Sequence, residues 1–420
     1  MQITLTDAVL FSTYFLLLFL AIFWMLVLLT GKEPERKKSL KTLPFFTAIV
    51  PAHNEEECIT ETLQSLVALE YPSEKKEIIV VNDGSTDQTA VLVQKFIREH
   101  PTMAITLINQ PNQGKGKALN TGLAQAHGEF YACLDADSFI APNALQEMLP
   151  YFEDTNVAAV CPLLKVKSPS SVLQKMQWVE YIINMFYKSL NARLDCVHVT
   201  PGPFSVYRTS VIRRLGGYDE RTITEDLEIA IRLQQHQYKI VQTFDAVVET
   251  VAPNTWKDLF RQRVRWYKGS VDCALAYKNL MFNRKYGDFG YIRMPTIFLS
   301  GIIALVLAGT LLQDMGRKLV HSFQSLQAIN FDLLTLLKHF SFNFNLLSLP
   351  FFKYFITLTL VGLSFFAMIY SYRLVKENIR HHGRTWITVV GYLTVYALFI
   401  SVVWLYIGYI SISNKRNSWS

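Results

Sequence analysis

Short apolar runs alternate with amphipathic stretches through the middle of the chain, from Phe45 to about Val251. The β-rich runs 45–50 and 77–81 are each followed by a segment with apolar positions at helical spacing. This alternation predicts βαβ units and an α/β domain with a mainly parallel sheet. Polar residues that follow the strands of such a sheet collect at its carboxyl edge, where ligands bind. We therefore expect the functional residues directly after strands.

Four long apolar segments lie outside this region. The first is uncharged, and each is close to the ~20 residues that cross a ~30 Å hydrocarbon core. Asp7 precedes the first segment and bulky residues end it, which favours a retained anchor over a cleaved signal peptide. The sequence therefore predicts four membrane spans, at 8–30, 295–312, 351–372 and 386–412.

Basic residues next to these spans predict their orientation. A cluster follows the first span, so the positive-inside rule places the N-terminus outside and the next domain in the cytosol. The basic segment 371–384 is then also inside, whereas 313–350 and the C-terminus are outside. The terminal Lys415 and Arg416 run against this orientation, and the stretch 331–349 is amphipathic enough to lie in the interface. The cluster after the first span is Lys32, Arg36, Lys37, Lys38 and Lys41.

Composition agrees with a membrane protein that has a soluble middle. Half of the 420 residues are hydrophobic, and only 18% are charged. The net charge of +7 comes from residues beside apolar segments and in one Arg-rich helix, which favours anionic lipid and a diphosphate over nucleic acid as partners. The five cysteines form no CxxC pair, which fits reduced thiols in the cytosol and gives no zinc pattern.

Three acidic motifs follow strands or begin a helix. After strand 77–81 come Asn82, Asp83 and Gly84, which turn the backbone and present Asp83 as a candidate nucleotide contact, although an ordinary capped turn has the same residues. After strand 130–134 come Asp135 and Asp137. Such hard oxygen ligands suit Mg²⁺ or Mn²⁺ on a diphosphate, although a solvated turn is the alternative.

The third acidic motif is Thr224-Glu225-Asp226, at the start of a predicted helix. Thr224 is the expected N-cap. Asp226 then lies in the first turn, where the helix dipole keeps its carboxylate ionised, as a catalytic base requires. A helix-start acid without any chemical role is the alternative.

A helix with two different faces is predicted over 256–268. Its apolar face is suited to the core or to the membrane interface. Gln262, Arg265 and Trp266 lie at i, i+3 and i+4 and share another face. Arginine pairs with phosphate oxygens and an indole stacks on a sugar ring, so this face suits a diphosphate and an acceptor sugar. A basic helix lying on anionic lipid is the alternative.

In this order, the motifs NDGSTD, DAD, TED and Gln-x-x-Arg-Trp resemble glycosyltransferase family 2, which has a GT-A fold. More narrowly, they are similar to its membrane-bound processive β-glycan synthases, which make cellulose, chitin, hyaluronan and poly-N-acetylglucosamine. The resemblance covers 45–285. It implies three regions: an anchor at 1–31, a GT-A domain with interface helices at 45–285, and a membrane region at 290–420.

The resemblance implies roles for individual residues on the donor side. Asp83 contacts the nucleobase, Glu55 lies near the nucleoside, and Asp135 contacts the donor. Either Lys115 or Lys117 is the lysine near the donor. Asp137 binds the metal, Mg²⁺ or Mn²⁺, with Asp135 beside it.

The resemblance also implies the groups on the acceptor side. Asp226 is the general base, assisted by Glu225. Trp266 lies at the acceptor sugar, and the Gly202-Pro203 turn lines the acceptor site. The remaining residues of the helix motif, Gln262 and Arg265, close the site toward the diphosphate.

A single base and a metal-assisted leaving group give one in-line displacement, and therefore inversion at the anomeric carbon. The expected enzyme is a hexosyltransferase of the cell membrane that moves a sugar, which we take as N-acetylglucosamine, from a UDP donor to a β-linked polysaccharide. One alternative is transfer of a single sugar to a lipid, as in ceramide glucosyltransferases. An inactive scaffold or export partner is another.

Overall fold

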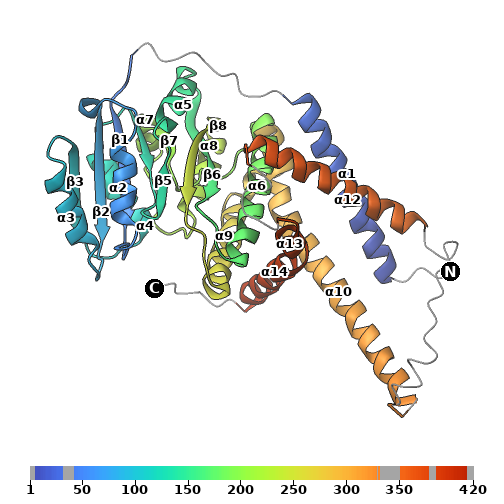
Figure 1. The fold of residues 1–420 in the computed structure, drawn as a ribbon. Helices are drawn as coiled ribbons and strands as arrows, with labels where there is room; N and C mark the ends of the chain where they lie inside the picture. Colours follow the sequence, from blue (N-terminus) through green and yellow to red (C-terminus); the bar gives the residue numbers. More distant parts are fainter. Residues whose placement is uncertain (1–4, 32–41, 329, 332–350, 378–384, 414–420) are drawn as a thin grey trace.

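The computed structural model describes residues 5–31, 42–328, 330–331, 351–377 and 385–413. Its centre is an eight-stranded sheet of order β3-β2-β1-β4-β7-β6-β8-β5 (Figure 1). The strands are β1 (Phe46–Ala52), β2 (Lys76–Asp83), β3 (Ala104–Gln110), β4 (Phe130–Cys133), β5 (Ser138–Ile140), β6 (Val157–Val166), β7 (Ser205–Arg208) and β8 (Lys239–Thr250).

The first four strands are all parallel, with β1 between β2 and β4. The β6–β8 pair is also parallel, whereas β7 runs antiparallel to β4 and β6, and β5 runs antiparallel to β8. The predicted mainly parallel α/β sheet is therefore confirmed. Because β1, β2 and β4 are parallel neighbours, the loops that follow them lie at one edge.

Helices cover both faces of the sheet, and alternate residues of each central strand point to opposite sides. Ala48 and Val50 pack with α2, α3 and α5, whereas Ile49 packs with α4, α7 and α8. Both faces are buried, which explains why these strands read as continuous apolar runs. These helices are α2 (Ile59–Val67), α3 (Thr89–Glu99), α4 (Lys115–Gln125), α5 (Ala144–Met148), α7 (Thr209–Arg214) and α8 (Glu225–Gln235), with short helical turns η1 (Ser73–Lys75) and η2 (Leu149–Glu153).

Four helical stretches are long and apolar enough to cross a membrane, as predicted: Phe11–Thr30, Phe289–Ala328, Tyr354–Leu374 and Ile387–Ser411. They lie to one side of the sheet (Figure 1). The elements are α1 (Leu5–Thr30), α10 (Met294–Ala328), α12 (Phe351–Leu374), α13 (Thr385–Gly391), a π-helical turn η7 (Tyr392–Tyr396) and α14 (Ala397–Ile412). Three short helical turns come directly before α10: η3 (Lys278–Leu280), η4 (Arg284–Tyr286) and η5 (Phe289–Arg293).

The helix that carries the second predicted span is longer than the span. The span is predicted to end near Leu312, whereas α10 continues as a single helix to Ala328. At about 1.5 Å per residue, its 35 residues exceed a ~30 Å hydrocarbon core, so its last turns extend beyond the core. The basic cluster at 32–41, residues 378–384 of the basic segment 371–384, most of the amphipathic stretch 331–349 and the terminal Lys415 and Arg416 lie outside the described residues.

Two amphipathic helices join the sheet domain to the membrane helices. They are α6 (Val172–Arg193) and α9 (Trp256–Ala276), which is longer than the predicted 256–268. The first packs against α1, α12 and α13, and the second against α10 and α14. The Arg193 guanidinium donates to the carbonyl oxygens of Leu28 and Gly31, at 2.9 and 3.1 Å. The end of α1 is therefore held by α6.

Candidate active site

One lysine joins three elements at the carboxyl edge of the sheet. Lys115 begins α4, and its Nζ lies 2.6 Å from Asp135 Oδ1 after β4 and 2.9 Å from Glu225 Oε1 at the start of α8. Burial disfavours the charged lysine, but the two carboxylates outweigh it and raise the Lys115 pKa well above its usual value. For Glu225, burial acts to raise the pKa, but the charge of Lys115 lowers it by more, so the net shift of the Glu225 pKa is downward.

This geometry separates the two candidate lysines. Lys117 points elsewhere, and its Nζ lies 3.4 Å from Glu220 Oε1 in an exposed pair. Two residues along a helix correspond to a rotation of about 200°, so both lysines do not face the same site. The residue at the site is Lys115.

A glycine lets the 201–203 turn approach this cluster. A Cβ on Gly202 would lie 2.7 Å from Asp135 Oδ2 and 2.9 Å from Lys115 Nζ, so a side chain here would displace the groups that form this cluster. Pro203 is buried beside it. The neighbouring Thr200 hydroxyl donates to the Asp226 carbonyl oxygen at 2.8 Å. The predicted acceptor-side turn is therefore packed against the donor-side cluster and the start of α8.

Asp226 is half-buried in the first turn of α8, at the predicted place. The Leu227 amide donates to its Oδ1 at 2.9 Å. Burial and the neighbouring Glu225 charge raise the Asp226 pKa to about 6, against the expected effect of the helix dipole. At neutral pH the carboxylate is still mainly ionised, and its pKa suits a group that accepts a proton and releases it again.

Two further carboxylates, Asp137 and Glu55, lie near Asp135. Burial and Asp135 raise the Asp137 pKa to about 6, and burial, Asp137 and Asp135 raise the Glu55 pKa to about 7. Carboxylates that raise one another's pKa suit a divalent cation, which offsets their charge. Among the described residues no group of three or more Asp, Glu, His or Cys side chains is placed to hold one. Asp135 and Asp137 therefore fit Mg²⁺ or Mn²⁺ only if substrate phosphates and water complete the shell.

Asp83 lies farther along the same edge and is almost completely buried. Its carboxylate accepts hydrogen bonds from Gln110 Nε2 at 2.7 Å and from the amides of Gln113 and Gly114 at 3.0 and 2.9 Å. Gly84, with φ +70°, turns the backbone after it, as predicted. Asp83 therefore holds the loop that leads into Lys115.

The Gln-x-x-Arg-Trp motif lies on α9, which packs closely against α8. A Cβ on Gly269 would lie 2.4 Å from the Thr224 Cγ2, so only glycine lets the two helices approach this closely. Arg265, one turn before Gly269, is near enough to lower the pKa values of Glu225 and Asp226. The motif therefore lies beside the candidate base.

A buried ion pair orients the aromatic end of the motif. The Arg263 guanidinium lies 2.5 Å from Glu180 Oε2 of α6 and 4.2 Å from the Trp266 ring centroid. Its Nη1 also donates to Gln262 Oε1. The Tyr396 hydroxyl of η7 donates to the same Glu180 oxygen at 2.7 Å. Trp266 and Gln262 are thus held by Arg263, whose partner Glu180 of α6 also accepts a hydrogen bond from the membrane region.

The sequence reasoning missed Arg263, Glu180 and Lys188. A charged residue inside an apolar stretch was the available signal for the first two, because Glu180 lies within WVEYII and Arg263 precedes Val264 on the apolar side of its helix. Lys188 lies near enough to Asp226 for that carboxylate to act on its pKa. Its Nζ is buried and has no hydrogen-bond partner among the described residues, and burial lowers its pKa.

Comparison with known proteins places these motifs in a family. Residues 47–216 match the model of glycosyl transferase family 2, and residues 132–410 match that of glycosyl transferase family group 2. The protein named "Probable glycosyltransferase YdaM" of Bacillus subtilis is 30% identical over 295 residues, which are 64% of this chain and 67% of that protein.

The poly-beta-1,6-N-acetyl-D-glucosamine synthase of Staphylococcus aureus strain COL is 34% identical over 248 residues, 58% of each chain. The match thus spans little more than half of that synthase. A mannosyltransferase from Pyrobaculum calidifontis, solved with GDP-Man and Mn²⁺, has the same fold with a TM-score of 0.62 at 20% identity, over 98% of this chain and 99% of that one.

We expect Lys115→Met to destabilise the fold and Lys117→Met to leave it nearly unchanged. Loss of Lys115 leaves Asp135 and Glu225 without their counter-charge. Because the Lys115 side chain is one-third exposed, we expect this to cost more than the ~1 kcal/mol of an exposed pair and less than the ~3 kcal/mol of a fully buried one. Lys117 belongs to an exposed pair, whose loss costs less than about 1 kcal/mol. Thermal unfolding of the purified variants measures both. Equal melting temperatures for the two would show that Lys115 does not hold the edge together.

Proposed function

We propose, on the premise that this chain belongs to glycosyl transferase family 2, that it moves N-acetylglucosamine from a UDP donor to a growing β-linked glycan with inversion. That it is a hexosyltransferase-type glycosyltransferase follows from the family. The observation that carries the mechanism is the cluster of Lys115, Asp135 and Glu225 beside Asp226. The sugar is inferred from the synthase relatives at 34% identity.

The proposed step is a single displacement. Asp226 takes the proton from an acceptor hydroxyl, whose oxygen attacks the anomeric carbon as the bond from that carbon to the diphosphate breaks. The electron pair of that bond leaves with the diphosphate. The Asp226 pKa of about 6 leaves the carboxylate ionised at neutral pH, ready to accept the proton. Because attack and departure occur on opposite sides, an α-linked donor gives a β-linked product.

Glu225 and Lys115 position the base and the donor in this proposal. The Glu225 carboxylate is fixed by Lys115, so the first turn of α8 is held against the end of β4. Lys115 brings a positive charge to the donor side, close to where Asp135 is to contact the donor. Asp83 and Glu55 are assigned to the nucleobase and the nucleoside, and Asp83 also fixes the loop before Lys115.

Asp135 and Asp137 would hold the divalent cation, with the donor diphosphate supplying further oxygen ligands. When bound, the cation offsets the negative charge that develops on the leaving nucleotide. The fold relative was solved with Mn²⁺, in agreement with this assignment. Arg265 of α9 would pair with the diphosphate from the other side, since its charge already acts on Glu225 and Asp226.

Trp266, Gly202 and Pro203 are assigned to the acceptor. Arg263 stacks on the Trp266 ring and keeps it oriented, and the half-buried indole would stack on an acceptor sugar. Gln262 is held by the same arginine. Because α6 and α9 join this site to the membrane helices, a lengthening glycan would leave toward the membrane.

The proposed arrangement in the cell follows from the donor, which is made in the cytosol. The anchor at 1–31, the catalytic domain at 45–285 and the membrane region at 290–420 would form a multi-pass protein of the cell membrane. The catalytic domain then faces the cytosol, and the N-terminus lies outside, in accord with the basic residues after the first span.

Incubation of membranes that contain the protein with single radiolabelled UDP-sugars, followed by sizing of the product, tests this function. We expect label from UDP-N-acetylglucosamine in a polymer. Label confined to a lipid-extractable product with one sugar would establish the single-transfer alternative. No incorporation from any UDP-sugar would favour the inactive scaffold.

Replacing the base tests its role. Asp226→Asn keeps the shape of the side chain but cannot accept the proton, so we expect transfer to fall by roughly 10²-fold to 10⁴-fold while donor binding is retained. Glu220→Gln, which changes an exposed carboxylate of the same domain, is the matched control and should behave as wild type. Initial rates and nucleotide-sugar titration measure the two properties.

The wild-type pH profile is a second readout of the same group. Protonation of Asp226 removes the base, so kcat/KM should fall as the pH drops through about 6, even at saturating metal. If Asp226→Asn kept substantial turnover and its kcat/KM still fell at the same acidic pH, Asp226 would not be the base.

Removal of the cation tests the two aspartates after β4. We expect chelation by EDTA to abolish transfer and added Mg²⁺ or Mn²⁺ to restore it. Asp137→Ala should weaken donor binding only when the metal is present, because its carboxylate acts through the cation. Full activity in EDTA would refute the metal assignment and leave these residues as a structural turn.

Cysteine labelling in intact cells tests the orientation. In a chain without its five native cysteines, a cysteine at the exposed Arg221 should resist an impermeant thiol reagent until the cells are permeabilised. A cysteine at Thr4, before the first span, should be labelled without permeabilisation. The reverse pattern would place the catalytic domain outside, where cytosolic donors do not reach it.

A further inference from the structure

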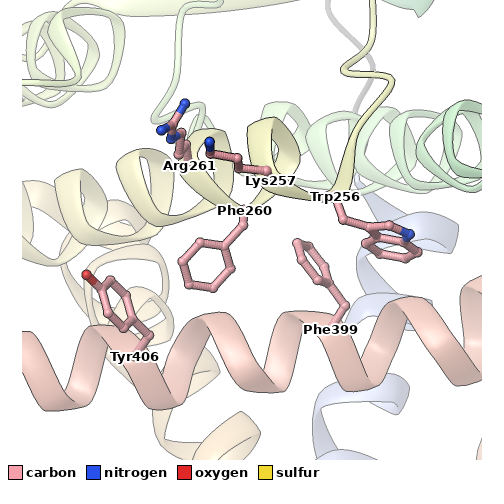
Figure 2. A pocket seen from close by; sticks show the side chains of 6 residues that line it. All are labelled: Trp256, Lys257, Phe260, Arg261, Phe399 and Tyr406. Carbon is pink, nitrogen blue, oxygen red and sulfur yellow. The ribbon is translucent and has the colours of Figure 1, made fainter.

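A cavity of about 510 Å³ lies between α9 and α14. Its volume is within the range of small-molecule sites. Figure 2 shows Trp256 and Phe260 extending from α9 toward α14, and Phe399 and Tyr406 extending from α14 toward α9. The rings contact one another, with centroids 5.1 Å apart for Trp256 and Phe399 and 5.3 Å apart for Phe260 and Tyr406. The four rings form an apolar floor.

Two cations lie at the edge of this aromatic groove. Lys257 and Arg261 complete its lining and are one helical turn apart on α9. Arg261 Nη1 is 3.8 Å from Asp258 in an exposed pair, and Lys257 has no ion pair with any described residue. Their aliphatic stems line the groove. The Lys257 ammonium is available to an anionic ligand, and the Arg261 guanidinium can exchange its long, exposed contact with Asp258 for one.

The groove is separate from the proposed active site. At about 100° per residue, the groove residues of α9 share one side of the helix, Gln262 and Trp266 lie on the opposite side, and Arg265 lies between the two, one turn from Arg261. The two faces of α9 therefore contact different surroundings. One faces the candidate base, and the other faces an apolar helix of the membrane region.

The cations indicate the depth of the groove in the membrane. A charged side chain near the bilayer centre costs at least about 2.5 kcal/mol, and two such side chains next to each other cost more. Lys257 and Arg261 therefore lie at the level of the headgroups. Because Phe399 and Tyr406 line the same groove, this depth would place the middle of Ile387–Ser411 near the headgroups, which departs from the predicted span at 386–412.

We propose that this groove binds an anionic phospholipid, with its phosphate on Lys257 and Arg261 and its acyl chain on the four aromatic rings. Charge complementarity and the position beside a membrane helix both indicate this occupant. The site does not depend on which sugar the enzyme transfers.

Quenching of tryptophan fluorescence by brominated lipids tests the proposal, because Trp256 lines the groove. The full chain is placed in bilayers of phosphatidylcholine that contain brominated phosphatidylglycerol or brominated phosphatidylcholine. The part of the quenching that Trp256→Phe removes reports lipid at the groove. We expect phosphatidylglycerol to be preferred there by roughly fivefold per cation, or up to about 25-fold for two.

The double variant Lys257→Gln/Arg261→Gln should lose this preference while its unfolding temperature is unchanged, since both residues are exposed. The matched control is Lys95→Gln/Arg98→Gln on α3, which removes the same charge far from the membrane helices and should keep the preference (Figure 1). Equal quenching by both lipids in the wild type, or an unchanged preference in the groove variant, would overturn the proposal. Neither result depends on transferase activity.

Discussion

The ammonium group of Lys115, held between the carboxylates of Asp135 and Glu225, determines the arrangement of the catalytic edge. It joins the end of β4 to the first turns of α4 and α8, which are far apart along the chain. Several carboxylates gather around this edge, and burial together with the neighbouring negative charges raises the pKa values of Glu55, Asp137 and Asp226. The remaining negative charge fits a site for a divalent cation, which would also bind the donor diphosphate.

A second charge pair connects this edge to the membrane region. Arg263 and Glu180 are both buried and pair with each other, and Tyr396 completes the contact from η7. Loss of one partner of a buried pair costs about 3–5 kcal/mol, so α6, α9 and η7 are held together strongly. Because Arg263 also stacks on Trp266, the same contact sets the position of the ring assigned to the acceptor.

Local patterns in the sequence predicted most of the fold and located the motifs. The alternation of apolar runs predicted the sheet, and the apolar segments predicted four helices long enough to span, since both signals depend on neighbouring residues. The choice between Lys115 and Lys117 depended on Asp135 and Glu225, which only the folded chain brings near. The Arg263–Glu180 pair was missed for the same reason. Nothing in the sequence indicated that the helix of the second span continues to Ala328, because the apolar run that indicates a span ends near Leu312.

The central claim is that one carboxylate base acts opposite a leaving diphosphate, so each transfer inverts the anomeric carbon. The most direct measurement is NMR of the product made by the purified protein from UDP-N-acetylglucosamine labelled with ¹³C at the anomeric carbon. The account predicts that the new glycosidic linkage is entirely β. An α-linked product would contradict it, because retention requires either a second nucleophile or attack on the same face as the leaving group.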